Sequence, residues 1–210
     1  NWDSDCGCVA ADNSGDDCDD CDGTPDGDAT VDSCGVCGGD GSSCLASLSL
    51  GSFDSSGSLE VLYDFGGPVA GFQFDVTGLA LTGGSGGAAG DAGMDVSAGG
   101  ATVLGFSFTN SEIAAGSGVL TVLSFSDVTA GTTELSLGNF GAVTDAQGNV
   151  YEASASGSID HGAPDCAGDY YGTAWNSDCG CVAADNSGDD CDDCAGTPDG
   201  TNWDSDCGCV

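Results

Sequence analysis

Fourteen cysteines occupy two regions near the ends of this 210-residue chain, and none lies between Cys44 and Cys166. In the second region they recur with a period of 28 residues, which relates three pairs: Cys166 with Cys194, Cys179 with Cys207, and Cys181 with Cys209. A segment of that length cannot bury a core of its own and usually needs covalent staples. Closing a loop of about 15 residues is worth on the order of 3 kcal/mol in the chain-entropy account. Both ends are therefore predicted to be small, loop-dominated, disulfide-rich repeats.

The cysteines group into units of four, with two disulfides expected in each. Two units are complete, Cys21, Cys34, Cys37 and Cys44, and Cys166, Cys179, Cys181 and Cys191; two are incomplete, Cys6, Cys8 and Cys18, and Cys194, Cys207 and Cys209. Four cysteines allow three pairings, so the sequence leaves the connectivity open. Cysteines this dense indicate an oxidising, extracellular or cell-surface location.

The two end regions are copies of one another. Residues 9–27 and 182–200 differ only where Asp22 corresponds to Ala195, and residues 202–210 repeat residues 1–9 letter for letter. Three domains follow from these boundaries: repeats over 1–44, an apolar and Gly/Ser-rich domain over 45–161, and repeats over 162–210. We interpret the chain as one period of a tandem or head-to-tail array; a local duplication is the alternative.

The charge of the chain restricts its partners. The sequence has no Lys or Arg and 35 acidic residues, which give a formal net charge of -35. Such carboxylates repel one another, and no cationic side chain is present to offset them. Oxygen ligands bind hard cations, so we expect Ca²⁺ as the cofactor. Nucleic acid and anionic lipid are excluded as partners, and no apolar run is long enough for membrane insertion.

One acidic motif suggests where calcium would bind. The segment ADNSGDDCDDC, at 11–21 and again at 184–194, resembles the calcium repeats of thrombospondin type 3. The resemblance implies ligands at Asp12, Asp16 and Asp19, and at Asp185, Asp189 and Asp192. Further oxygens could come from Asp3, Asp5 and Asp178 once the chain folds back. The alternative is a solvated acidic face.

The middle domain has the period-two pattern of β-strands. One predicted strand places Leu59, Val61, Tyr63 and Phe65 on a single face, another does so with Phe72, Phe74 and Val76, and a third contains Phe106 and Phe108. Further strands are expected over 118–125, 133–137 and 149–155. Roughly eight short strands separated by Gly-rich turns predict an all-β fold, a jelly-roll-like β-sandwich.

Three segments of this domain carry a resemblance to a known family. They are VAGFQFDVTGLAL at 69–81, FSFTNSEIAAGSGVLTVLSF at 106–125 and DAQGNVYEASASGSI at 145–159. In this order they resemble the cohesin-like and related carbohydrate-binding β-sandwich modules. The resemblance implies a jelly-roll sandwich with a binding or scaffolding role, and a carbohydrate or protein ligand.

A segment of the first repeat region resembles part of a protease family. VDSCGVCGGDGSSC, at 31–44, is similar to the segment that closes the cysteine-rich module of the ADAMTS extracellular proteases. The HExxH zinc motif of a protease is absent, and His161 is the sole histidine. The resemblance therefore extends to a spacer and not to an activity, and we expect no enzyme.

These features predict a structural subunit of an extracellular fibre, filament or surface stalk, stapled by disulfides, rigidified by calcium and assembled with copies of itself. The alternative is a cohesin-like module that binds carbohydrate or protein on a Cys-rich stalk. Trp2, Trp175 and Trp203 are equivalent positions of the repeats and are the candidate assembly contacts. A packing anchor over a disulfide is the other reading of these tryptophans.

Overall fold

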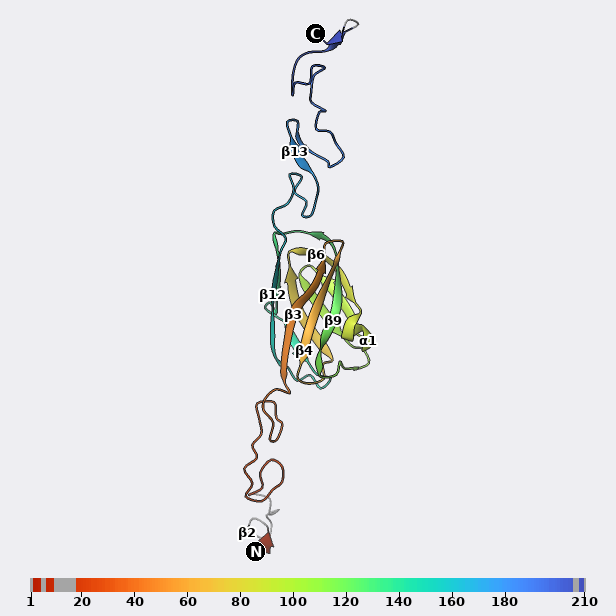
Figure 1. Cartoon of the computed structure of the whole chain (residues 1–210). Coiled ribbons are helices and arrows are strands. Elements are labelled where there is room, and N and C mark those ends of the chain that lie inside the picture. Colours follow the sequence, from red (N-terminus) through yellow and green to blue (C-terminus); the bar gives the residue numbers. More distant parts are fainter. Residues whose placement is uncertain (1, 5–6, 10–17, 206–207, 210) are drawn as a thin grey trace.

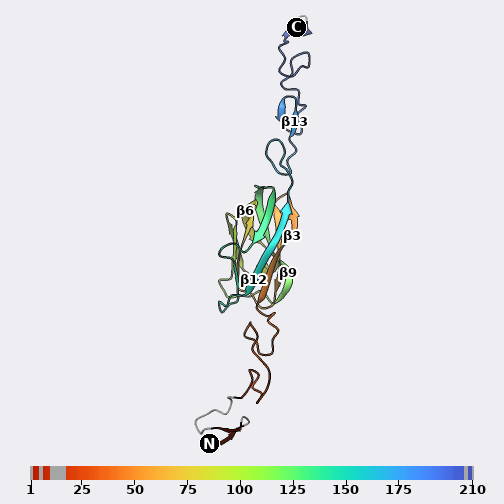
Figure 2. The same ribbon diagram turned by 90° about the vertical axis from the view of Figure 1, so that its left-hand side faces the viewer.

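A β-sandwich lies in the middle of an elongated molecule. The structure, a computed structural model, describes residues 2–4, 7–9, 18–205 and 208–209. Extended segments leave the sandwich at opposite ends, so the two termini lie at the two ends of the molecule in both views (Figures 1 and 2). We call residues 18–44 the N-terminal rod and residues 162–205 the C-terminal rod.

The sandwich consists of ten strands and one short helix. In chain order these are β3 (Leu45–Asp54), β4 (Ser58–Phe65), β5 (Gly71–Thr77), β6 (Leu79–Ser85), α1 (Gly87–Asp91), β7 (Asp95–Gly99), β8 (Thr102–Phe106), β9 (Gly116–Val128), β10 (Thr132–Ser136), β11 (Ala142–Thr144) and β12 (Glu152–Asp160). The predicted all-β class with disulfide-rich flanks is confirmed.

Strand β12 belongs to both layers of the sandwich. The strands are ordered β6-β9-β4-β3-β12-β10-β5-β8-β7, and β11 pairs with β5. Residues 152–156 of β12 pair with β3, and residues 157–160 pair with β10. The change of layer falls at Gly157, whose φ of 153° and close approach to Leu50 favour a residue without Cβ.

The first and last strands of the sandwich run in the same direction. β3 and β12 pair in parallel, from Leu45 beside Glu152 to Ser49 beside Ser156. The other neighbouring strands pair antiparallel. Because β3 begins at the pole where β12 also begins, the chain enters the sandwich at one pole and leaves it at the other.

The core fills the space between the two layers. Period-two alternation places one side chain in two on the inner face, as expected for a sandwich. The largest fully buried side chains come from both layers: Phe65, Phe74, Leu59, Leu120, Leu123, Val61, Val69, Val76, Val103 and Val143. The inward faces predicted for β4 and β5 are correct, except that Tyr63 is only half-buried.

Some sequence expectations for the sandwich were wrong or incomplete. Phe106 and Phe108 do not share a strand, because β8 ends at Phe106 and the ring of Phe108 is 81% exposed beyond it. The last strand begins at Glu152 and not at residue 149. The short helix α1 was not predicted, because five residues rich in Gly and Ala have no helical periodicity to recognise.

Short hairpins make up the regular structure outside the sandwich. They are β1 (Trp2–Ser4) with β2 (Gly7–Val9), β13 (Trp175–Ser177) with β14 (Gly180–Val182), and β15 (Asp204–Ser205) with β16 (Gly208–Cys209). Each one contains a copy of the same repeat sequence, which explains why three separate parts of the chain fold alike. The rest of the rods consists of turns and loops.

Candidate functional site

Disulfides connect the described cysteines in one recurring pattern. The bonds are Cys21–Cys37 and Cys34–Cys44 in the N-terminal rod, and Cys166–Cys181 and Cys179–Cys191 in the C-terminal rod. Cys18 and Cys194 are also disulfide-bonded. Within each complete unit the first cysteine pairs with the third and the second with the fourth. This resolves the connectivity that the sequence left open.

The pattern interlocks the two disulfide loops of a unit. Cys34 lies in the loop closed by Cys21–Cys37, and Cys179 lies in the loop closed by Cys166–Cys181. A force along the rod therefore passes from the first cysteine across a disulfide to the third, back a few residues to the second, and across the other disulfide to the fourth. The loops cannot be pulled straight while both bonds are intact.

An unexpected ten-residue loop closed by an aspartate recurs four times in the rods. In each loop the carboxylate at position i accepts hydrogen bonds from the backbone N–H groups of residues i+2, i+4 and i+9, at 2.8–3.1 Å. The closing residues are Asp20, Asp32, Asp165 and Asp193. None was among the predicted calcium ligands, so these four carboxylates have a structural role that the sequence did not indicate.

Two glycines make this loop possible and form its sequence signal, Asp-x-x-Gly-x-x-x-Gly. The first has a positive φ in all four copies, as Gly168 does at 97°. The second lies against the carboxylate, so that a Cβ at Gly172 would overlap Oδ2 of Asp165. This spacing of one aspartate and two glycines identifies the motif in the sequence, whereas the spacing typical of calcium ligands does not include its aspartates.

Hydrogen bonding holds the loop carboxylates in the charged form. The pKa of Asp20 lies below its ordinary value, chiefly because the N–H of Thr24 donates to it. The pKa of Asp165 is lowered in the same way, chiefly by the N–H of Asp169. At Asp193 desolvation acts to raise the pKa, but three backbone hydrogen bonds and one from the Asn202 side chain together outweigh it, and the net direction is down.

Three of the predicted calcium ligands in the C-terminal rod face one hollow. Asp178, Asp189 and Asp192 line a depression of about 180 Å³ together with Trp175 and Ser187. The pKa of Asp192 is raised by desolvation and then by the negative charges of Asp189, Asp178 and Asp193. These oxygens have the chemistry that calcium prefers. Asp185, in contrast, is exposed and does not line the hollow.

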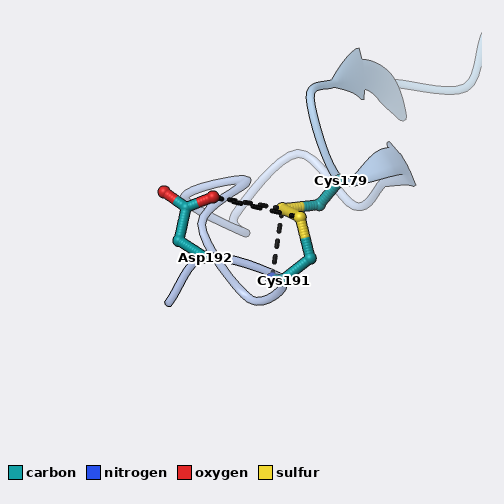
Figure 3. Close-up of side chains that lie close together, drawn as sticks. All are labelled: Cys179, Cys191 and Asp192. Carbon is teal, nitrogen blue, oxygen red and sulfur yellow. Dashed lines mark hydrogen bonds between the residues drawn. A yellow bond between two sulfur atoms is a disulfide. The ribbon is translucent and has the colours of Figure 1, made fainter. Parts of the chain in front are cut away.

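The closest cluster of possible metal ligands at this hollow is a disulfide and not a metal centre. Cys179, Cys191 and Asp192 lie within 4.8 Å of one another, and they are the one such group in the described residues. Figure 3 shows that the two sulfurs are bonded to each other. They have no thiolate to offer, and their 3.8 and 3.9 Å approaches to Asp192 Oδ1 are contacts without a proton. The described carboxylates are not gathered at coordinating distance.

Several predicted site residues lie outside what the structure describes. Asp5, Cys6, Asp12, Asp16 and Cys207 are outside the described residues. For four others only the backbone is described, namely Trp2, Asp3, Cys8 and Cys209. Asp19 is half-buried and forms a backbone bridge with Pro25. Calcium binding therefore stays a prediction in both copies.

Of the tryptophans nominated as assembly contacts, two have described side chains. Trp175 is 42% exposed, and its ring packs against the backbone at Gly188. Trp203 is 64% exposed. The first therefore serves at least partly as a packing anchor within its own unit, whereas the second presents most of its surface to solvent.

The N-terminal rod joins the sandwich without a linker. The carbonyl oxygen of Cys44 accepts a hydrogen bond of 2.9 Å from the N–H of Glu152, at the start of β12. The N–H of Gly66 donates to Leu45 O at 2.9 Å. Because the Cys34–Cys44 disulfide ends where β3 begins, the last staple of the rod is anchored directly to the sandwich.

The C-terminal rod packs on the other pole through aromatic side chains. His161 Nε2 lies 2.7 Å from Thr133 Oγ1, and His161 Nδ1 lies 2.7 Å from the hydroxyl of Tyr171. The rings of Phe53 and Tyr170 flank the imidazole at centroid distances of 4.9 and 6.3 Å. His161 is buried, and these contacts place it at the centre of the joint.

One outer face of the sandwich carries exposed apolar side chains. Leu104 and Gln73 are partners on β8 and β5, and the Gln73 amide donates to Phe140 O at 3.2 Å. Phe106 and Phe108 pack edge to face at 4.7 Å. Phe108 and Phe140 are 81% and 83% exposed. We call Leu104, Phe106, Phe108 and Phe140 the outer aromatic face.

Among the described residues, no helix is long and apolar enough to span a membrane.

Comparison with known proteins finds similarity among solved structures. No protein-family model matches the sequence, and no curated protein matches it. Three solved structures are similar over 55% of this chain. They are a non-cellulosomal cohesin from Archaeoglobus fulgidus (17% identity, TM-score 0.40, 90% of that chain), the sixth cohesin of Acetivibrio cellulolyticus scaffoldin B in complex with a Cel5 dockerin (18%, 0.41, 96%), and the Coh-OlpA–Doc918 complex from Clostridium thermocellum (15%, 0.40, 98%).

These neighbours are cohesin domains, and what they share with this chain is a β-sandwich. At identities of 15–18% and scores of 0.40 and 0.41 the likeness carries no argument about function. The fold described above rests on its own strand order and core.

Proposed function

We propose that this chain is a load-bearing spacer of an extracellular fibre or stalk, in which the sandwich is a bead held in line between two stapled rods. The observation that carries the proposal is the parallel pairing of β3 with β12. Because the chain enters and leaves at opposite poles, repeated units would extend along one axis. Four disulfides in the described residues support an oxidising, extracytoplasmic location.

The same pairing suits the sandwich to tension. A pull on the two rods would slide β3 and β12 past each other, which loads their hydrogen bonds together and not one after another. The interlocked disulfide loops would transmit this tension through covalent bonds. Both joints are tied to the sandwich, at Cys44 and at His161. Stiff joints favour a spacer over a flexible tether.

Assembly with further copies is part of the proposal. Residues 202–210 repeat residues 1–9, so a chain that continued there as it does after Val9 would complete the last unit with a cysteine equivalent to Cys18. The exposed ring of Trp203 lies in this repeated segment. We expect contacts between copies there.

Calcium is proposed as a stiffening ion for the rods. Its support is the hollow lined by Asp178, Asp189 and Asp192, where desolvation and then the repulsion of neighbouring aspartates raise the pKa of Asp192. A divalent cation would relieve that repulsion by drawing the carboxylates together. The disulfides and the aspartate loops close without it, so we expect removal of calcium to loosen the rods and not to unfold the sandwich.

Electron microscopy of native, unreduced protein with and without EDTA tests this proposal. Linear filaments with an axial repeat are expected, with a more sharply bent contour after chelation. Dispersed particles in both conditions, at concentrations up to the solubility limit, would contradict assembly. Filaments whose contour is unchanged by EDTA would contradict calcium as a stiffening ion, but they would still agree with the spacer function.

A binding role for the bead is the second candidate, and the outer aromatic face favours it. Two phenylalanines more than four-fifths exposed are unusual on a domain that has a well-filled core. Since the chain has no cationic side chain, the partner expected here is a protein with a basic rim around an apolar centre. The paired substitution of Phe108 and Phe140 by Ser should abolish capture of such a partner and leave filaments unchanged.

We propose no catalytic activity for the chain. The sole histidine is engaged by Thr133 and Tyr171 in the joint. A surface hollow of about 430 Å³ is lined mostly by small side chains, with Asp64 and Glu152 as its charged members. Assays of the purified protein against peptide and glycoside substrates should show no turnover.

A further inference from the structure

The joint between the sandwich and the C-terminal rod contains a histidine whose two ring nitrogens meet hydroxyl groups of very different exposure. Thr133 Oγ1, beside Nε2, belongs to a fully buried residue of β10, whereas Tyr171, beside Nδ1, is 49% exposed. Among the described residues, Thr133 Oγ1 has no other hydrogen-bond partner. The buried hydroxyl can therefore place its proton only on Nε2.

This difference fixes the tautomer of the neutral imidazole. Thr133 O–H donates to Nε2, and Nδ1–H donates to the hydroxyl oxygen of Tyr171, whose own proton can point to solvent. Protonation would put a second N–H on the ring at Nε2. The Thr133 hydroxyl would then have to rotate, and its proton would be left without an acceptor in the core.

The rod reaches this histidine through the aspartate loop of residues 165–174. The ring of Tyr171 packs against His161 at 5.7 Å and against Phe53 at 5.9 Å. The ring of Tyr170 also contacts the imidazole, at 6.3 Å, and its hydroxyl approaches Gly131. Between His161 and the loop there are only Gly162, Ala163 and the proline that follows, so these ring contacts set the direction of the rod.

We propose that His161 is a pH-sensitive latch, which holds the 165–174 loop and the C-terminal rod against the pole of the sandwich while it is neutral and releases them when it is protonated. The latch would make the stalk straight and stiff at neutral pH and jointed in acid. The inference concerns this joint and holds whether or not the chain bears load.

The groups around the imidazole favour its neutral form in the closed joint. β3 and β10 contribute Phe53 and Thr133, neither of which titrates, and the loop contributes the hydroxyls of Tyr170 and Tyr171. Desolvation lowers the pKa of His161, and the charge of Asp160 opposes it by a smaller amount. Stability that depends on the neutral ring is complete above the ordinary pKa of about 6.5 and is lost as pH falls through the lower pKa of the closed joint.

Nuclear magnetic resonance of the full chain tests the latch directly, because the single histidine gives an unambiguous ring signal. The Cε1–H resonance is titrated from pH 8 to pH 4, and small-angle scattering is recorded on the same samples. We expect a midpoint below 6.5 and a change in the scattering profile with the same midpoint. Each pH unit by which the midpoint lies below 6.5 corresponds to a tenfold change, on protonation, in the equilibrium between the closed and the open joint.

Three variants separate the latch from general acid effects on a chain so rich in carboxylates. His161→Gln keeps a donor and an acceptor but cannot be protonated, so its scattering should not change through this window. Tyr171→Phe weakens the closed state, so the titration midpoint of its histidine should move toward 6.5. This variant also replaces His161→Gln as the test if the glutamine variant does not fold. Tyr63→Phe, on β4 away from the joint, is the matched control and should titrate like the unsubstituted chain.

Two results would overturn the latch. One is a midpoint at or above 6.5 in the unsubstituted chain. The other is a pH-dependent scattering change in His161→Gln equal to that of the unsubstituted chain, or, where Tyr171→Phe is used, a midpoint that does not move.

Discussion

Stretching single molecules by their ends should separate the mechanical roles of the sandwich and the rods. In unreduced protein we expect one main extension event, the opening of the sandwich between Leu45 and Asp160. At roughly 3.3–3.6 Å per extended residue, that event should lengthen the chain by roughly 350–400 Å. The complete stapled units should add no length, because their interlocked disulfides carry the force.

Addition of a reductant should change this pattern in a calculable way. Once both bonds of a unit are broken, the segment from Cys21 to Cys44 or from Cys166 to Cys191 becomes free to extend. At the same extension per residue, each unit should release roughly 60–70 Å, which is easily distinguished from the sandwich.

The control for the force experiment is the same molecule before and after reductant is introduced, with the sandwich step as an internal length standard. Extensions of the size expected for a stapled unit in the absence of reductant would refute the disulfide force path. A sandwich that opens in many small steps, and not in one, would refute simultaneous loading of the β3–β12 pair.

Three further predictions concern the elements that hold the molecule together. Asp165→Asn should free the backbone amide of Ala174, because an amide side chain cannot accept all three backbone hydrogen bonds, and that amide should then exchange hydrogen faster. The control is Asp169→Asn, whose side chain closes no loop and which should leave the exchange rate unchanged. The aspartate loops should stay closed in mild acid. Because the pKa values of Asp20 and Asp165 are lowered, the stability that their charged form contributes is complete above the ordinary value of 3.8 and is lost only as pH falls through the lower folded value. Loop amides that open near pH 5 would contradict closure of the loops by these carboxylates. Phe74→Ala should lower the free energy of unfolding of the sandwich by about 3–5 kcal/mol in urea titrations, since its ring is fully buried, and a loss under 1 kcal/mol would contradict the core described.

The sequence was sufficient for the class of fold and for the nature of the flanks. Alternation of side chains reports which residues face inward, as it did for Phe72, Phe74 and Val76, because the pleat of a strand is a local property. Clustered cysteines indicated staples for segments too short to bury a core. The same local reasoning failed at Phe108, since nothing in the alternation reveals that β8 ends two residues earlier.

The candidate site was less predictable from local patterns. Calcium-type spacing drew attention to residues such as Asp185, which is exposed and apart from the hollow, and away from Asp165, which closes a loop. Both are aspartates in acidic, Gly-containing segments. What distinguishes them is a pair of glycines at fixed distance, one for a positive φ and one for close approach of the carboxylate.

By itself, the sequence determined an all-β domain between disulfide-rich repeats, because strand alternation, cysteine content and repetition are all properties of neighbouring residues. Only the tertiary structure decided how the units are connected and joined. Three contacts bring together residues at least ten positions apart along the chain: the pairing of first with third cysteine, the parallel contact of β3 with β12, and the burial of His161 between Thr133 and Tyr171. Such contacts are selected by the packing of the whole domain, which no local pattern encodes.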